Sequence, residues 1–262
     1  MLAIVALYAC KKDEPIDTIS VNGALSGEFS VSLTDKVHFS QGNLQFNKNA
    51  NTWRFATNQW EVYGGFKDGV TDLHVWSHAD DSTFSDWGQY AISNGGNQPD
   101  QWRTLTKDEW MYLFHGRANA EYLFGFGKVN GVKGLIILPD NGGSIGNFKS
   151  AAEKGFVWRY TDYRHYYSNT KSADIFSHNT FKGKKWHEME NAGAVFLPAA
   201  GNWLRSEQSG QDLGKYGDYW SATRDLSTGY ATDVFCMDFY QQALSPMCSA
   251  RWDYEFSVRL VQ

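Results

Sequence analysis

Apolar and polar residues alternate in two pairs of short segments near the start of the chain's body. The first pair, over residues 29–33 and 36–40, predicts a β-hairpin. The second pair, over 43–47 and 52–56, flanks an Asn-rich stretch that favours a turn, so a second hairpin is predicted. Residues 57–101 are dominated by Gly, Asp, Asn, Ser and Trp, and we expect long ordered loops there.

The first helical signal follows these loops. Thr106 and Glu109 have the spacing of a capping box, in which each side chain accepts a hydrogen bond from the other residue's amide. Trp110, Leu113 and Phe114 then fall on one face of the helix. The sequence therefore predicts a helix that begins at this box and packs through its apolar face.

The pattern changes several times before the C-terminal third. Residues 131–139 predict a buried strand ended by a proline, and 194–201 predict a strand and a turn. Residues 140–178 are loop-rich. A second helix is expected from about Thr180 to Asn191, closed by Gly193.

The C-terminal third consists of short strand-like segments, over 219–224, 232–240, 242–250 and 256–261. Short strands, two helices and long irregular loops predict an α+β fold with small twisted antiparallel sheets, because regular βα alternation is absent. The sequence has no internal repeat and no Pro- or Ser-rich linker. We therefore expect one domain over residues 27–262.

The N-terminus predicts export. Residues 1–9 are apolar and uncharged, too short to span a bilayer, and typical of the end of a signal peptide whose basic region is missing. The segment ending at Cys10 resembles a bacterial lipobox, which implies that Cys10 is lipidated and that residues 10–26 form a polar tether. We expect a lipoprotein on the outer-membrane surface of a Gram-negative bacterium; a free N-terminal thiol is the alternative.

Charge and composition narrow the class of partner. The net charge is −5 and the densest basic cluster is Lys182, Lys184 and Lys185, so nucleic-acid binding is not expected. Aromatic residues make up 16% of the chain, with 11 Trp. This content favours an aromatic core, with a binding surface for sugar or protein as the alternative.

Several short motifs resemble known families. Residues 102–110, WRTLTKDEW, are similar to a signature of the formylglycine-generating-enzyme-like (sulfatase-modifying-factor-like) fold. Residues 219–223, 233–239 and 256–261 resemble the Fibrobacter succinogenes major paralogous domain, and further segments resemble surface lipoproteins of gut bacteria. The motifs occur in order across 38–261. The resemblance implies a C-type-lectin-like fold.

The tripeptide Gln98-Pro99-Asp100 matches the one with which galactose-specific C-type lectins hold calcium and sugar. In those lectins the tripeptide follows both helices and acts with a Trp-Asn-Asp sequence. Here it precedes the first helix, and Trp-Asn-Asp does not occur. Calcium takes six to eight oxygen ligands, which one Gln and one Asp do not supply. We therefore expect a turn, and no metal or other cofactor.

A second metal-like spacing is His74 and His78 with Asp80 and Asp81. Two histidines four residues apart share a face only on a helix. The surrounding sequence is loop-like, so a solvated loop is the expectation.

The two C-terminal cysteines allow a catalytic hypothesis. Formylglycine-generating enzymes use a pair of cysteines near the C-terminus, and Cys236 and Cys248 lie in the last third of this chain. The RGGSW-type sequence of those enzymes is absent, and no His lies near either cysteine in the sequence. Without a nearby base we expect a noncatalytic protein, with an oxidase as the less favoured reading.

The same cysteines have a structural interpretation. Phe235, Met237 and Phe239 alternate, which predicts that they face the core and that Cys236 points outward. If the two segments form a hairpin, Cys248 falls roughly opposite Cys236, and a cross-strand disulfide becomes possible. Two free cysteines remain the alternative.

The C-terminal strands are the candidate ligand surface. In several lectin-like proteins of this kind their outward side chains bind ligand, and some members are diversified there by retroelements. The resemblance implies a ligand that is a protein or glycan on another cell, a phage or the host. A polar outer face without such a role, or a structural envelope or fimbria-associated subunit, is the alternative. The corresponding positions here are Arg224, Asp233, Asp238, Tyr240, Gln241, Trp252, Asp253 and Tyr254.

Overall fold

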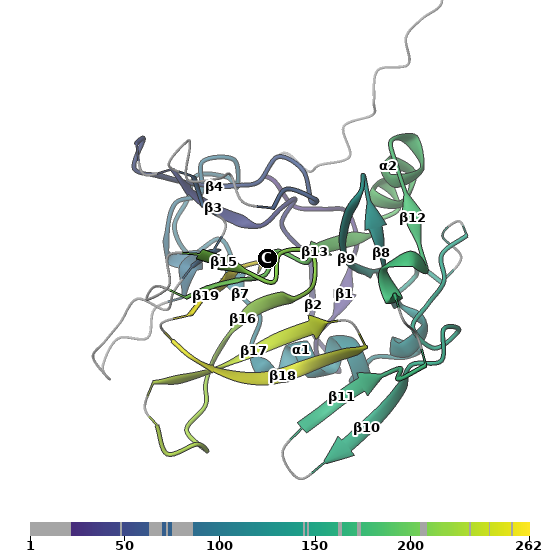
Figure 1. Ribbon diagram of the computed structural model, residues 1–262. Coiled ribbons are helices and arrows are strands. Elements are labelled where there is room, and N and C mark those ends of the chain that lie inside the picture. The colour runs from purple at the N-terminus through teal and green to yellow at the C-terminus, as the bar shows by residue number, and fades with distance from the viewer. Residues whose placement is uncertain are drawn as a thin grey trace, which may run out of the picture.

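Both N-terminal hairpins are present in the computed structural model. Strands β1 (Phe29–Ser30) and β2 (Lys36–Val37) pair antiparallel. Strands β3 (Leu44–Asn47) and β4 (Thr52–Phe55) do the same, and β5 (Val70–Thr71) adds to β3. The Asn47 side chain accepts hydrogen bonds from the next turn's amides, which explains the Asn-rich connection. The structure describes residues 22–262 except 48, 63–69, 72, 75–85, 144, 146, 162–163, 172–173, 205–208, 231, 241 and 253 (Figure 1).

The first helix begins at the predicted capping box. α1 (Lys107–Met111) has Thr106 as its N-cap, with both reciprocal bonds to Glu109, and continues as a π-helical turn, η3 (Tyr112–Gly116). Trp110, Leu113 and Phe114 are fully buried, as their common face predicts. Before the helix lie the 3-10 turn η2 (Trp87–Gln89) and the short strand β7 (Arg103–Thr104).

The second helix is shorter than expected. α2 (Lys184–Asn191) starts after Gly183, and Gly193 follows it with a φ of 91°. Thr180 and Phe181 form strand β12 instead, pairing parallel with β8 (Phe124–Val129). The expected helical start at Thr180 was wrong because strand pairing with β8 holds this segment extended.

A four-stranded sheet lies beside α2, in the order β12-β8-β9-β13. Strands β9 (Val132–Ile137) and β13 (Val195–Pro198) occupy the two predicted apolar segments. Ile136 of β9 and Phe196 of β13 belong to a core cluster that also includes Trp186 of α2. A 3-10 turn, η4 (Ala120–Tyr122), leads into β8.

The largest sheet has nine strands and holds the C-terminal third (Figure 1). Its order is β10-β11-β18-β17-β16-β19-β14-β15, and β6 (Leu73–His74) also pairs with β19. The remaining bounds are β10 (Val157–Thr161), β11 (Arg164–Ser168), β14 (Asn202–Leu204), β15 (Ser209–Gln211), β16 (Gly217–Arg224), β17 (Asp233–Tyr240), β18 (Ala243–Arg251) and β19 (Tyr254–Ser257).

One of these hairpins was not expected. Residues 140–178 are loop-rich in sequence, but within them β10 and β11 pair over five residues each, and a 3-10 turn, η5 (Ile175–Ser177), follows. Trp158 and Tyr167 face the core from this hairpin, with ring centroids 4.8 Å apart. Its tyrosines gave no clear strand period, and in the hairpin they pair across the strands with Trp158, Arg159 and His165.

The two ends of the described chain pair with each other. Strand β20 (Leu260–Val261) pairs with β7, and the amides of His38 and Gln262 each donate to the other residue's carbonyl. Leu25 is buried, and its amide donates to Phe39. The packed body thus begins before Gly27, a few residues earlier than expected.

The architecture is α+β, with small sheets and two α-helices in the described part of the chain. Three core clusters fill it, and each contains several aromatic side chains. This agrees with the aromatic-core interpretation of the composition. No helix in the described residues is long and apolar enough to span a membrane.

Candidate functional site

The candidate surface is built on three long antiparallel strands, β16, β17 and β18. Helix α1 packs behind them (Figure 1). The Trp110 indole N–H donates to the carbonyl of Trp220 at 3.4 Å, and the Lys107 amide donates to the hydroxyl of Thr223 at 3.0 Å. These bonds join the helix start to β16, so the strands form a fixed platform.

The sequence-predicted residues divide between the two ends of these strands. Asp233 lies opposite Arg251 at one end of the β17–β18 hairpin, and Tyr240 lies opposite Ala243 at the other. Seven strand steps separate Asp233 from Tyr240, or roughly 23 Å. All six described candidates are half-buried. Three of them lie towards the Asp233 end, namely Arg224, Trp252 and Tyr254, and Asp238 lies beside Tyr240. The other candidates fall outside the described residues: Gln241, Asp253 and the lipidation candidate Cys10.

Some of the side chains at the Asp233 end pack against the core. Trp252 and Tyr254 pack against the second core cluster, and the Tyr254 ring lies 5.6 Å from that of Phe256. Because much of each ring is used in packing, this end offers less free surface than the sequence indicates.

The Tyr240 end opens into a cavity of about 210 Å³. The Tyr216 ring stacks on that of Tyr240, with centroids 5.2 Å apart. An aromatic pair therefore borders the cavity, and the serine and threonine in its wall supply hydroxyls. We call this the tyrosine cavity; it is lined by Thr161, Tyr166, Tyr240, Ala243 and Ser245.

Two carboxylates lie next to the tyrosine cavity. Asp218 on β16 stands directly opposite Asp238 on β17, and Asp238 is opposite Ser245 on β18. Asp218 is buried, and the Asn202 side-chain amide donates to its Oδ2 at 3.2 Å. Burial, with repulsion from Asp238 and Asp212, raises the pKa of Asp218 to about 7. The site thus holds a carboxyl group that changes charge near neutral pH.

The strand register explains why these polar residues lie outside the apolar core. Trp220 and Cys236 face the second core cluster, whereas the next pair on the same side of the sheet is Asp218 and Asp238. The apolar part of this face therefore ends between the Trp220–Cys236 pair and the Asp218–Asp238 pair.

Sequence reasoning missed five polar or aromatic residues of this site. Asp218 and Tyr216 immediately precede the motif at 219–223, and the stretch GDY gave no sign that its aspartate is buried. The others come from β10, β11 and β18, whose register the pattern did not supply. Those residues are Thr161, Tyr166 and Ser245.

The two C-terminal cysteines are joined by a disulfide, and they lie opposite each other on β17 and β18. The expectation that Cys236 points outward was wrong: it is 1% exposed, while Phe235 is half-buried beneath the ammonium of Lys107. The reason is that core clusters cover both faces of β17, and each cluster covers a different part of the strand. Met237 and Phe239 face the first core cluster, and Cys236 faces the second.

The Gln98-Pro99-Asp100 tripeptide forms an exposed turn. Asp100 has a φ of 58°, and its amide donates to the carbonyl of Gly88 at 2.9 Å. The expected turn is confirmed, and its backbone geometry explains the sequence.

The second metal-like spacing is only partly described. His74 lies in strand β6, and His78, Asp80 and Asp81 fall outside the described residues. Among the residues with described placement, no group of three or more His, Cys, Asp or Glu side chains is arranged to hold a metal ion.

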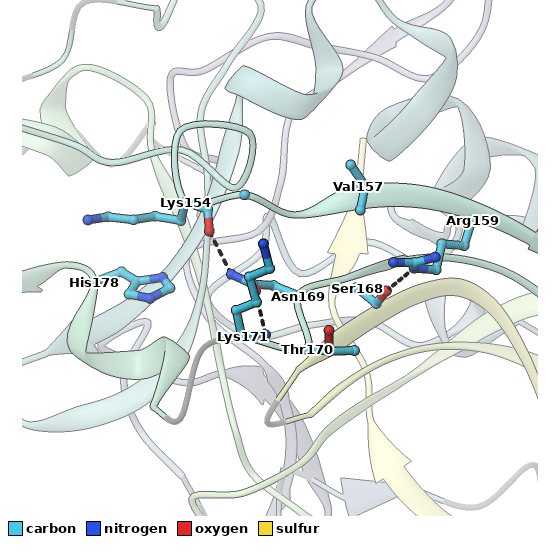
Figure 2. Close-up of a pocket in the computed structure, with 9 residues that line it drawn as sticks. Lys154, Val157, Arg159, Ser168, Asn169, Thr170, Lys171 and His178 are labelled. Atoms are coloured by element: carbon cyan, nitrogen blue, oxygen red, sulfur yellow. Dashed lines mark hydrogen bonds between the residues drawn. The ribbon is translucent and has the colours of Figure 1, made fainter.

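A second cavity, of about 570 Å³, lies at the other end of the β10–β11 hairpin (Figure 2). Its wall carries three cationic side chains and a histidine. We call it the basic hollow; it is lined by Lys154, Gly155, Val157, Arg159, Ser168, Asn169, Thr170, Lys171 and His178.

Comparison of the chain with known proteins found no match. No protein-family model matches the chain, and neither a curated protein nor a solved structure does. Function is therefore inferred from the residues and their geometry.

Proposed function

We propose that the chain is a noncatalytic, lipid-anchored cell-surface protein with a C-type-lectin-like fold. It binds a protein or glycan ligand through the outer face of β16, β17 and β18. The observation that carries this proposal is the tyrosine cavity at the end of that face, with stacked Tyr216 and Tyr240 beside two carboxylates.

The chemistry of the site suits such a ligand. Tyrosine rings offer flat apolar surfaces and hydroxyl groups at a low cost in conformational entropy. Asp238 and the hydroxyl of Ser245 present acceptors for sugar hydroxyls or for N–H groups of a protein. The Cys236–Cys248 disulfide joins β17 to β18 and helix α1 supports the strands from behind, so little ordering is needed on binding.

The expected anchor leaves room between the body and the membrane. The described body begins at Asn22, which is 22 − 10 = 12 residues after Cys10. Twelve residues reach at most about 40 Å when fully extended. A lipidated Cys10 therefore allows the body to stand clear of the lipid headgroups.

Replacing Tyr240 by Ala is expected to weaken ligand binding by about tenfold or more, because the variant loses an aromatic contact at the centre of the site. The full chain is applied to a printed glycan array and to a panel of bacterial and host cells, and affinities are measured for every hit. Tyr122→Ala is the matched control, since Tyr122 is exposed on η4. Equal affinity of Tyr240→Ala and the wild type for every hit contradicts the proposal.

The hypothesis of a retroelement-diversified receptor leads to a separate prediction about the gene. Sequencing its 3′ end in many isolates is expected to show substitutions at adenines of codons between Arg224 and Tyr254, beside a reverse-transcriptase gene. A fixed segment without a template repeat would instead indicate a dedicated binder or a structural envelope subunit.

A further inference from the structure

The basic hollow has no part in the proposed use of the C-terminal strands. Residues alternate along the β10–β11 hairpin, so Trp158 and Tyr167 face inward while Val157, Arg159 and Ser168 face the hollow. The inward side is anchored by the Trp158 ring, which stacks on His115 at 4.0 Å. This packing fixes the position of the hairpin, whose outward side faces solvent.

Positive charge is concentrated here in a chain with a net charge of −5. Lys154, Arg159 and Lys171 line the hollow. Within the described part of the chain, none of them lies within ion-pair distance of a carboxylate, whereas Lys36, Arg103, Lys107, Lys128 and Lys215 all do. These three cations are therefore not held in close ion pairs, although Glu153 interacts with Lys154 at longer range.

Hydrogen bonds fix the Arg159 guanidinium and the backbone of Lys154 and Lys171. The Arg159 Nε–H donates to the Ser168 hydroxyl at 2.6 Å, which orients the guanidinium and leaves its two terminal nitrogens available. The Asn169 side chain donates to the Lys154 carbonyl at 2.6 Å and accepts from the Lys171 amide at 2.9 Å. Figure 2 shows Arg159 on one side of the hollow, with Lys154 and His178 on the other.

A neighbouring cavity borders the hollow. His178 lines both, and the second cavity has a volume of about 580 Å³. Its wall adds one cation, Lys185, one carboxylate, Glu188, and the apolar side chains of Phe181 and Met189, so the excess of positive charge lies in the hollow itself. Two cavities in series match a chain-like ligand better than a single small ion. Burial, together with the charge of Lys154, lowers the pKa of His178, which favours its neutral form and a role as a hydrogen-bonding group.

We propose that the basic hollow and the cavity joined to it at His178 bind an acidic polysaccharide, through sulfate or carboxylate groups on its sugar rings. Lys154, Arg159, Lys171 and Lys185 pair with the anionic groups, and Ser168, Thr170 and Asn169 accept from or donate to sugar hydroxyls. This site is separate from the tyrosine cavity, where Asp218 and Asp238 would repel an anion.

The test uses immobilised dextran sulfate and polygalacturonate, with neutral dextran as the uncharged match. The full chain is expected to bind at least one of the two anionic polymers, with affinity that falls as salt rises, and to ignore dextran. The two polymers identify sulfate or carboxylate as the preferred group. Arg159→Met/Lys171→Met is expected to lower affinity by about tenfold or more, because two direct charge contacts are lost.

The matched control is Lys36→Met/Lys215→Met, which removes the same net charge from exposed lysines outside the hollow and is expected to bind like the wild type. Tyr240→Ala is also expected to retain binding, and this outcome separates the hollow from the proposed C-terminal site. Lys171→Met alone repeats the test if the double variant is unstable.

Three results would overturn the proposal. The first is a wild type that binds neither anionic polymer. The second is equal binding by the hollow variant and the wild type, or an equal loss in the control double variant. The third is hollow-dependent binding to phosphatidylcholine vesicles containing phosphatidylglycerol without binding to either polymer, which would assign the site to lipid headgroups.

Discussion

Replacing Asp218 by Asn is expected to remove a pH dependence of about 3 kcal/mol in the free energy of unfolding between about pH 5 and about pH 8.5. Burial raises the pKa of the Asp218 carboxyl from 3.8 to about 7, with Asp238 and Asp212 adding repulsion. The neutral acid is therefore the form that suits the folded site. An asparagine keeps a carbonyl that can accept the hydrogen bond of Asn202 and never ionises.

The sign of the effect follows from which state holds the proton. In the unfolded chain Asp218 is ionised above about pH 4, whereas in the folded chain it keeps its proton to about pH 7. The folded state therefore binds more protons between these values, and stability falls as pH rises through this window. Stability from this group is complete below about pH 4 and lost above about pH 7, a total of about 4 kcal/mol.

The measurement is urea unfolding of the wild type and Asp218→Asn at several pH values. Taking the difference between the two proteins cancels other carboxyls, such as Asp140, whose pKa is lowered mainly through the bonds and charge supplied by Ser30 and Arg117 against the cost of burial. Asp100→Asn is the control, because Asp100 is exposed in a turn with a φ that asparagine tolerates. A constant difference between wild type and Asp218→Asn across this pH range would refute the assigned pKa.

The same carboxyl links stability to the proposed binding face. Ionisation of Asp218 beside Asp238 increases the negative charge next to the tyrosine cavity as pH rises. A cationic group of a ligand would favour the ionised form, and a neutral sugar would not. Comparison of binding above and below about pH 7 therefore reports on the charge of the bound group.

Local signals in the sequence predicted the parts of the fold that depend on local chemistry. The Thr106–Glu109 capping box needs only residues three apart, and it starts α1 as expected. The Asn47 turn and the two early hairpins are local in the same way. The rough opposition of Cys236 and Cys248 also follows from a hairpin, but a register shift between Cys236 and Asp238 is needed to bring Cys248 directly opposite Cys236.

Features that depend on distant pairing were not predictable in this way. Thr180 and Phe181 are extended because β8 lies beside them, about fifty residues earlier in the chain. The buried position of Cys236 depends on a core cluster built from segments such as those around Phe55 and Trp102. The tyrosine cavity and the basic hollow both require the β10–β11 hairpin, whose alternation is masked by aromatic residues on both faces.

Arg259 is the clearest case of a residue whose role only the fold reveals. It lies between two apolar residues in a strand-like sequence, yet it is 1% exposed. Its Nε donates to Asn43 Oδ1 at 3.1 Å, and its two terminal nitrogens donate to the carbonyls of Ser40 and Phe196 at 3.0 and 2.7 Å. One guanidinium thus joins the C-terminal segment to the stretch before β3 and to β13.

Replacing Arg259 by Met is expected to destabilise the protein by about 3–5 kcal/mol, because buried acceptors lose their donor and each unsatisfied group costs about 1–3 kcal/mol. For a chain of this size we expect the unfolding temperature to fall by roughly 10 °C. Arg259→Lys keeps the charge but lacks the planar fork that reaches divergent acceptors, so it is expected to recover only part of the loss. Arg251→Met is the control, since Arg251 is exposed and surface changes usually cost about 0.5 kcal/mol or less. Thermal and urea unfolding of the three variants measure these changes in stability. A loss of stability in Arg259→Met no larger than that in Arg251→Met would show that the guanidinium does not hold these segments together.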